Sequence, residues 1–149
     1  MKIKNLYFSP VKSLSFNNVD NLEIIKNIGI KNDRIFAFTN NLNLKDIELI
    51  KNDPLKREIY KFLSLKKYPE LNEYNFLLED NFLILEFENK IILKTDIDNQ
   101  HEVKILCSKL EDILPNINNI NLLKDNMNPF FDTMPNKSIS LINLNSIKD

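Results

Sequence analysis

Glycine is nearly missing from this chain, since Gly29 is the single glycine among its 149 residues. Glycine-rich loops that bind dinucleotides or nucleoside triphosphates need two or three glycines, so both kinds of site are excluded. Cys107 is the only cysteine, which excludes an intrachain disulfide and is typical of a reducing compartment. His101 is the only histidine, and with one cysteine it cannot supply the ligands of a zinc site. We therefore interpret His101 as a surface residue.

The chain also lacks an excess of charge and a long apolar run. Its 20 basic and 21 acidic side chains give a net charge of -1, so any phosphate site must be local. No apolar run reaches membrane length, and the first six residues lack the hydrophobic segment of a signal peptide. A composition of 43% hydrophobic and 28% charged residues is typical of a globular domain with a core. These observations predict a cytoplasmic protein with neither nucleic acid nor a membrane as its partner.

Short alternating patterns of apolar and polar residues predict a β-rich chain. The strands expected from these patterns lie near 2–8, 22–24, 34–39, 61–65, 74–78, 82–87, 90–94 and 120–123. The separators within 74–94 are hairpin-sized, which favours an antiparallel barrel or curled sheet over a parallel one. Gly29 lies in a turn, where positive φ is the physical reason for a glycine, and asparagines are expected to cover the other turns.

Two segments are expected to be helical, and the second has the period of a helix. A short helix is expected at 44–50, and a longer one at 101–114, with Asp98 or Asn99 as its cap and Pro115 ending it. Cys107 lies on the apolar face of the longer helix, which indicates a core thiol rather than a nucleophile. The sequence thus predicts a β-rich α+β fold with an antiparallel, barrel-like domain and one helix near 101–114.

Two short motifs carry the functional argument. The first is Ser-Pro-Val-Lys-Ser at 9–13, and the second is Gly-Ile-Lys-Asn-Asp-Arg at 29–34. In this order and spacing they resemble the N-terminal β-barrel domain of the MOSC family, which handles sulfurated molybdenum cofactor. That domain carries a Pro-[Val/Ile]-Lys-Ser loop followed by a Gly-Leu-x-x-Asp-Arg turn. The resemblance implies a MOSC N-terminal β-barrel domain over residues 1–115.

A third motif lies near the end of the sequence. Phe-Asp-Thr-Met-Pro at 131–135, followed by an apolar run from 138, resembles the start of the catalytic MOSC domain. The resemblance implies that 116–149 are a linker and the truncated beginning of that domain, with its first strand and the start of a helix. We therefore expect this chain to be the front portion of a longer protein. Met134 departs from the small residue often found at that position.

The resemblance implies five cofactor-binding residues: Lys12, Ser13, Arg34, Asp132 and Thr133. A phosphate monoester suits a point cation, a planar bidentate cation and a hydroxyl donor, which Lys12, Arg34 and Ser13 would supply to the pterin phosphate. Without the resemblance, Lys12 and Ser13 are a solvated lysine and a turn serine, and Arg34 forms a local ion pair with Asp33. Asp132 and Thr133 would then be a helix cap or an Asx turn.

The family uses molybdenum cofactor in two ways, and the sequence leaves both open. Its members are carriers of the sulfurated cofactor, or reductases of N-hydroxylated compounds that receive electrons from a small electron-transfer protein. Both activities need a molybdenum-ligating cysteine in the catalytic domain, and Cys107 does not match it. We therefore expect this fragment, which binds molybdopterin in the full-length protein, to be inactive alone. The alternative is a stand-alone β-barrel module that binds a ligand or a protein without catalysis.

Overall fold

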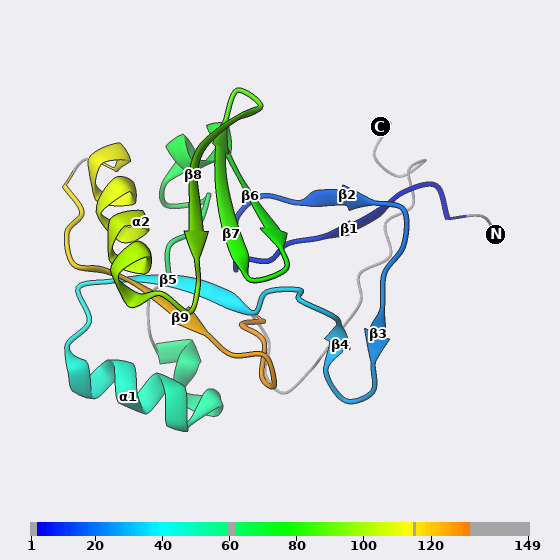
Figure 1. Cartoon of the computed structure of the whole chain (residues 1–149). Coiled ribbons are helices and arrows are strands. Elements are labelled where there is room, and N and C mark those ends of the chain that lie inside the picture. The colour runs from blue at the N-terminus through cyan, green and yellow to red at the C-terminus, as the bar shows by residue number, and fades with distance from the viewer. Residues whose placement is uncertain (1–2, 60–61, 115, 132–149) are drawn as a thin grey trace.

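The computed structural model describes residues 3–59, 62–114 and 116–131, which form small antiparallel sheets and two α-helices (Figure 1). The strands are β1 (Leu6–Phe8), β2 (Asn17–Val19), β3 (Ile24–Ile25), β4 (Gly29–Ile30), β5 (Phe36–Asn40), β6 (Tyr74–Glu79), β7 (Phe82–Phe87), β8 (Lys90–Asp96) and β9 (Ile120–Lys124). The α-helices are α1 (Leu44–Asn52) and α2 (Gln100–Ile113), and short 3-10 helices span Pro54–Ile59 and Pro69–Glu73. The predicted β-rich α+β fold is confirmed at this level.

The three strands β6, β7 and β8 form the expected meander. Tyr74 pairs with Phe87 across β6 and β7, and Phe82 pairs with Asp96 across β7 and β8. The two connecting turns have positive φ at Asp80, Glu88 and Asn89, as tight hairpin turns require. The sequence therefore predicted both the positions and the pairing order of this sheet.

Helix α2 packs beside β8 and closes one side of the core. The Asn99 side chain caps it by accepting hydrogen bonds from the backbone N–H groups of His101 and Glu102, at 3.1 and 3.4 Å. Its buried side chains are Leu106, Cys107 and Leu110, the face that the sequence pattern indicated. The shorter helix α1 begins after the cap Asn43, where a short helix at 44–50 was expected.

The hydrophobic core lies between the meander, α2 and the antiparallel pair β5–β9. In β5, Phe36, Phe38 and Thr39 are at most 1% exposed, so this strand is covered on both faces. Strand β9 pairs with it from Ile120 to Lys124. Ile120 is buried in this core, whereas Leu123 is buried in a second cluster with Ala37, Ile50 and Phe130. The division at residue 115 stays a prediction, while β9, beyond that residue, packs with β5.

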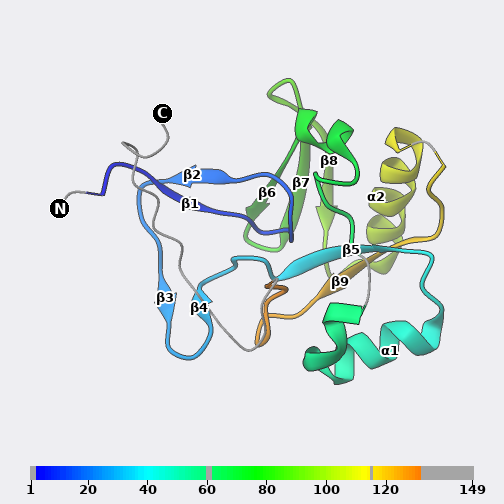
Figure 2. The same cartoon turned by 180° about the vertical axis from the view of Figure 1, so that it is seen from behind.

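The sheets stay separate, and none closes into a barrel within the residues that the structure describes. Closure would need a backbone ladder between the β1–β2 ribbon and the edge of the meander. Side chains occupy that junction instead: Ser15 Oγ accepts from the Phe76 N–H at 2.7 Å, and Asn17 Nδ2 donates to the Phe76 carbonyl at 2.8 Å. The ribbons β1–β2 and β3–β4 therefore extend to one side of the body (Figure 2).

The segment after residue 61 differs from the strand expected at 61–65. Phe62 makes only an isolated bridge to Thr39, and Leu63 donates its N–H to the Phe38 carbonyl at 2.9 Å. The Ser64 carbonyl then accepts N–H groups from residues 67 and 68, which turns the chain before a strand can extend. The predicted strand was wrong because the apolar residues of this segment, such as Leu63 and Leu65, pack on the core while the chain turns at Ser64.

Backbone conformation explains the unusual residue usage in turns. Gly29 has φ of 110°, which confirms the expected reason for the only glycine. Positive φ values also occur at asparagines in turns, as the sequence predicted. These asparagines are Asn27, Asn32, Asn41, Asn89, Asn116 and Asn119.

Candidate functional site

The two N-terminal motifs lie side by side because their backbones are hydrogen bonded. The Arg34 N–H donates to the Ser9 carbonyl at 2.6 Å, and the Phe36 N–H donates to the Pro10 carbonyl at 3.0 Å. The Lys12 N–H in turn donates to the Phe36 carbonyl at 2.8 Å. Val11, which is fully buried, forms a parallel bridge with Phe36 between these bonds. The backbones of the two motifs, which contain Lys12 and Arg34, are thereby paired although 21 residues separate these two cations in sequence.

Asp33 joins the motifs with its side chain. Its carboxylate accepts the Ser9 N–H at Oδ1, at 2.9 Å, and the Arg34 guanidinium at Oδ2, at 2.5 Å. Asp33 is 3% exposed, so the ion pair has a buried acidic partner, while the Arg34 side chain is 26% exposed. The ion pair that the sequence offered as the alternative for Arg34 is present. It also orients the guanidinium beside the first motif.

Both predicted cations contact the segment that precedes residue 132. Lys12 Nζ donates to the Phe130 carbonyl at 3.4 Å and lies 5.7 Å from the centre of the Phe62 ring. The Arg34 guanidinium carbon lies 5.4 Å from the centre of the Phe131 ring, and the Arg34 carbonyl accepts the Phe130 N–H at 2.7 Å. The segment at 130–131 thus lies against Lys12 and Arg34 together.

Ser13 and Arg34 have unusual backbone geometry. Their φ values are 58° and 53°, in the left-handed region that costs most residues other than glycine and asparagine free energy. The Ser13 carbonyl accepts the Leu65 N–H at 3.4 Å, which helps to hold the loop in this conformation. Asp80 and Glu88 adopt similar φ values in the hairpin turns, so the conformation of Ser13 and Arg34 does not by itself mark a functional site.

Sequence reasoning missed a third cation, Arg57. It contacts the segment at 125–130 that leads into Phe131. It is 4% exposed and donates to the Ile50 carbonyl at 3.2 Å and to the Asn128 carbonyl. Its guanidinium also pairs with the Asp125 carboxylate at 2.5 Å and stacks 4.3 Å from the centre of the Phe130 ring. No pattern near residue 57 distinguishes it from surface lysines, so only the fold reveals this role.

The environment of Arg57 lowers the pKa of the Asp125 carboxyl. Burial raises its pKa, but the hydrogen bond from Arg57 and the backbone N–H groups of Met127 and Asn128 outweigh burial and lower the pKa below its usual value. Asp125 is therefore held as a carboxylate. The resulting charge pair fixes the turn that leads into residues 130–131.

The remaining predicted residues divide into two groups. Asp132 and Thr133 lie outside the described residues, as does the rest of the third motif. His101 is exposed at the start of α2, as expected, and Cys107 is 7% exposed in the core. Burial raises the pKa of the Cys107 thiol to about 11, which leaves almost no thiolate at neutral pH.

We expect Cys107 to resist alkylation. At pH 8 a thiol with a pKa near 11 has about 200-fold less thiolate than an ordinary cysteine, before any loss from restricted access is counted. Iodoacetamide labelling followed by mass spectrometry should therefore be at least about 100-fold slower for the folded protein than for the same protein in denaturant. The rate should rise with pH up to about 11. Equal labelling rates in both states would show that the thiol is accessible and ionised.

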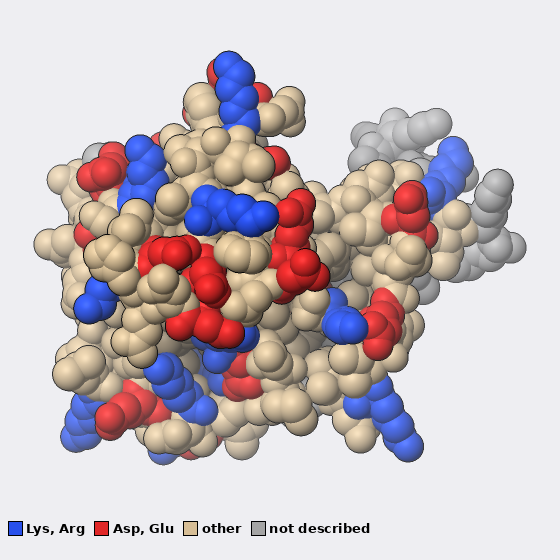
Figure 3. Space-filling model, in the orientation of Figure 1, with Lys and Arg blue, Asp and Glu red and all other residues tan. Residues whose placement is uncertain are grey.

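Other classes of site find no support in the part of the chain that is described. Within it, no group of three or more His, Cys, Asp or Glu side chains could hold a metal ion. No helix in the same residues is long and apolar enough to cross a membrane. Figure 3 shows positive and negative side chains interspersed over one face, with carboxylates gathered near its middle.

Comparisons with protein-family models, with curated proteins and with solved structures found no match to this chain. The functional argument therefore uses the arrangement of Lys12, Ser13 and Arg34 together with the motifs in the sequence. Of these residues, Lys12 and Arg34 have side chains that contact the same short segment at 130–131.

Proposed function

We propose that this chain is the molybdenum-cofactor-binding portion of a MOSC-domain protein of the cytoplasm. In the full-length protein it would serve a carrier of sulfurated cofactor or a reductase of N-hydroxylated compounds. The observation that supports the proposal is the backbone pairing of the two motifs, together with the contacts of Lys12 and Arg34 to the same segment at 130–131. The chain has a net charge of -1, and both of these cations belong to the motifs that resemble the family.

Each residue has a distinct role in this proposal. Lys12 supplies a compact charge on a flexible stem, and Arg34 supplies directed N–H donors from a guanidinium that Asp33 already orients. Ser13, in its left-handed conformation, adds a hydroxyl beside Lys12. Asp33 neutralises part of the charge on Arg34, so the site would favour a phosphate that meets Lys12 and Arg34 together over one that meets Arg34 alone.

The described residues fit the anionic end of the cofactor and not its metal. Molybdopterin carries a phosphate, for which Lys12 and Arg34 are suitable partners. Cys107 is buried in the core with a raised pKa, so it is unsuitable as a thiolate ligand. When bound, the cofactor would supply the redox or sulfur-transfer chemistry, and this chain would bind and orient its phosphate. The metal-ligating cysteine and the electron-transfer partner are then expected to belong to the catalytic domain of the full-length protein.

Substitution of Arg34 tests the proposal. In full-length protein from cells that make the cofactor, Arg34→Ala should retain less molybdenum than Arg34→Lys, and both should retain less than the parent. Loss of a charge-assisted hydrogen bond of about 1.5 to 3 kcal/mol weakens binding roughly tenfold to a hundredfold. Lysine keeps the charge but loses the planar pair of donors. Molybdenum is measured by elemental analysis, over a range of salt concentrations.

Lys31→Ala is the matched control, because Lys31 is in the same turn and pairs with Glu23 on the surface, with its side chain 51% exposed. It should retain molybdenum as well as the parent does. Equal molybdenum in the parent and both Arg34 variants would mean that Arg34 is only the partner of Asp33, and the proposed role would be wrong.

A further inference from the structure

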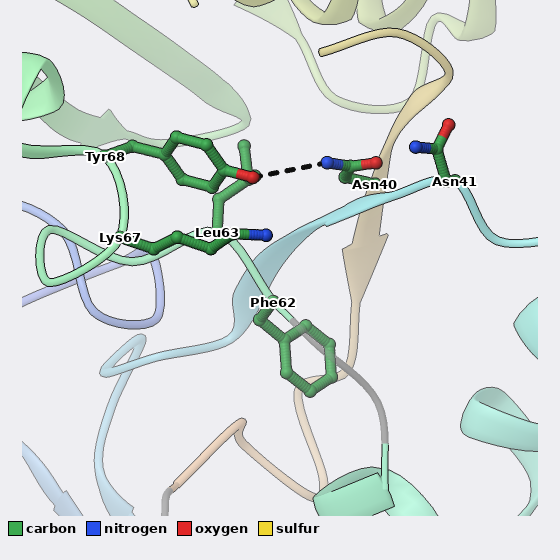
Figure 4. A pocket seen from close by; sticks show the side chains of 6 residues that line it. All are labelled: Asn40, Asn41, Phe62, Leu63, Lys67 and Tyr68. Atoms are coloured by element: carbon green, nitrogen blue, oxygen red, sulfur yellow. Dashed lines mark hydrogen bonds between the residues drawn. The ribbon is translucent and has the colours of Figure 1, made fainter. Parts of the chain in front are cut away.

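A small pocket opens between the end of β5 and the turn at 62–68 (Figure 4). Its volume is about 200 Å³, and it is lined by Asn40, Asn41, Phe62, Leu63, Lys67 and Tyr68. Leu63 is buried and gives the pocket an apolar wall, whereas the Lys67 side chain is exposed at its mouth. A cavity of about 150 Å³ accommodates a benzene ring, so this pocket has room for a single-ring molecule.

The polar groups of the pocket form an incomplete hydrogen-bond set. Asn40 Nδ2 donates to the Tyr68 hydroxyl oxygen at 3.4 Å, so the Tyr68 proton can be donated to another acceptor. Asn40 Oδ1 is buried and accepts no hydrogen bond from the described residues. A buried acceptor without a donor is costly, and a bound molecule with an N–H group would remove that cost. Because Oδ1 is buried, the amide must turn to meet such a donor. The soft last torsion of asparagine allows this at the cost of the weak Nδ2 bond to Tyr68.

Lys67 adds charge to this set. Its ammonium lies 5.0 Å from the centre of the Tyr68 ring. In Figure 4 the Lys67 and Tyr68 side chains extend from the turn toward Asn40. The pocket therefore combines a cation, a hydroxyl donor and an orphaned acceptor around an apolar wall. Each group has a complement in a small aromatic acid that carries an amino group.

We propose that this pocket binds a small, planar, single-ring acid that also bears an N–H donor. The acid group pairs with Lys67 and accepts the Tyr68 hydroxyl proton, the ring lies on Leu63, and the N–H group donates to Asn40 Oδ1. None of these groups belongs to the two N-terminal motifs. The proposal is therefore independent of the molybdenum cofactor, and it gives the chain a ligand of its own.

The probe is 4-aminobenzoate, titrated into the isotope-labelled chain without any cofactor. Benzoate lacks the donor and aniline lacks the acid, so each should bind about tenfold more weakly than 4-aminobenzoate. Amide shifts at residues 40, 41, 63, 67 and 68 should move together with a dissociation constant of about a millimolar, as expected for a ligand of this size. The absence of saturable shifts at these residues up to about 20 mM would overturn the proposal.

Two variants and a control assign the contacts. Lys67→Gln and Tyr68→Phe should each weaken binding of 4-aminobenzoate about fivefold to tenfold. Lys66→Gln removes the same charge from the adjacent exposed residue and should bind as the parent does. Lys67 and Lys66 are both exposed, so neither replacement threatens the fold. Equal affinity in the parent, Lys67→Gln and Lys66→Gln, or equal affinity for all three probes, would show that the pocket recognises neither acid nor donor.

Discussion

Replacing Arg57 with alanine is expected to lower the free energy of unfolding by about 3 to 5 kcal/mol, because it breaks a buried charge pair by removing one partner. The Asp125 carboxylate would lose its ion pair, and the carbonyls of Ile50 and Asn128 would lose their donor. The Phe130 ring would also lose the guanidinium that stacks on it. Urea denaturation followed by circular dichroism measures the change.

The neighbouring residue supplies the control for Arg57. Lys56 is 55% exposed in its side chain and pairs with Asp53 on the surface, so Lys56→Ala should cost less than about 1 kcal/mol. Arg57→Lys should fall between the two, because an ammonium keeps the charge but cannot reach three acceptors with one planar group. A loss below about 1 kcal/mol for Arg57→Ala would show that the segment at 125–130 is not held by this residue.

The same charge pair predicts a pH dependence. The pKa of Asp125 is lowered in the folded protein, so its contribution to stability is complete above its unfolded value of about 3.9 and disappears as the pH falls through the folded pKa. Asp125→Asn should therefore be less stable than the parent near neutral pH. The difference should shrink on acidification below about pH 4, which denaturation curves at several pH values would reveal.

Asp33→Ala is expected to have the next largest effect, a loss of about 3 kcal/mol in the free energy of unfolding. The variant leaves the Ser9 N–H without its acceptor in a buried position and leaves Arg34 without its counter-ion. Because Asp33 joins the two motifs, its loss should also reduce molybdenum retention in the full-length protein. Urea denaturation measures the stability and elemental analysis measures the metal.

Asparagine separates the two functions of Asp33. Asp33→Asn keeps an oxygen for the Ser9 N–H but removes the negative charge, so it should lose about half as much stability as Asp33→Ala. Asp20→Ala, at an exposed acidic residue, should change stability by less than about 0.5 kcal/mol. If Asp33→Ala proved as mild as Asp20→Ala, the carboxylate would have no part in joining the motifs.

Local signals explain why much of the fold could be predicted. Helix α2 combines an apolar face with an Asn99 cap, and the meander combines alternation with short polar turns, so neither depends on distant residues. The strand predicted at 61–65 failed because its apolar residues pack on the core through a turn. Periodicity cannot distinguish these two uses of a short apolar run.

The candidate site was predictable only where it is local. The motifs named Lys12, Ser13 and Arg34, but the contact of Lys12 with the Phe130 carbonyl spans 118 residues. The pairing of Arg57 with Asp125 spans 68 residues and joins two segments whose composition resembles a solvated surface. Such contacts depend on how the sheets pack against each other, which no short pattern encodes.

The pairing of β5 with β9 also determines when this protein can fold during its synthesis. The β5–β9 ladder pairs Thr39 with Asn121, so it cannot form until the chain has been synthesised 82 residues beyond Thr39. At ribosomal rates of about 5 to 20 residues per second, that delay is about 4 to 16 s. During this time the apolar strand β5 has no backbone partner in β9, so its unpaired N–H and C=O groups are open to pairing with other chains.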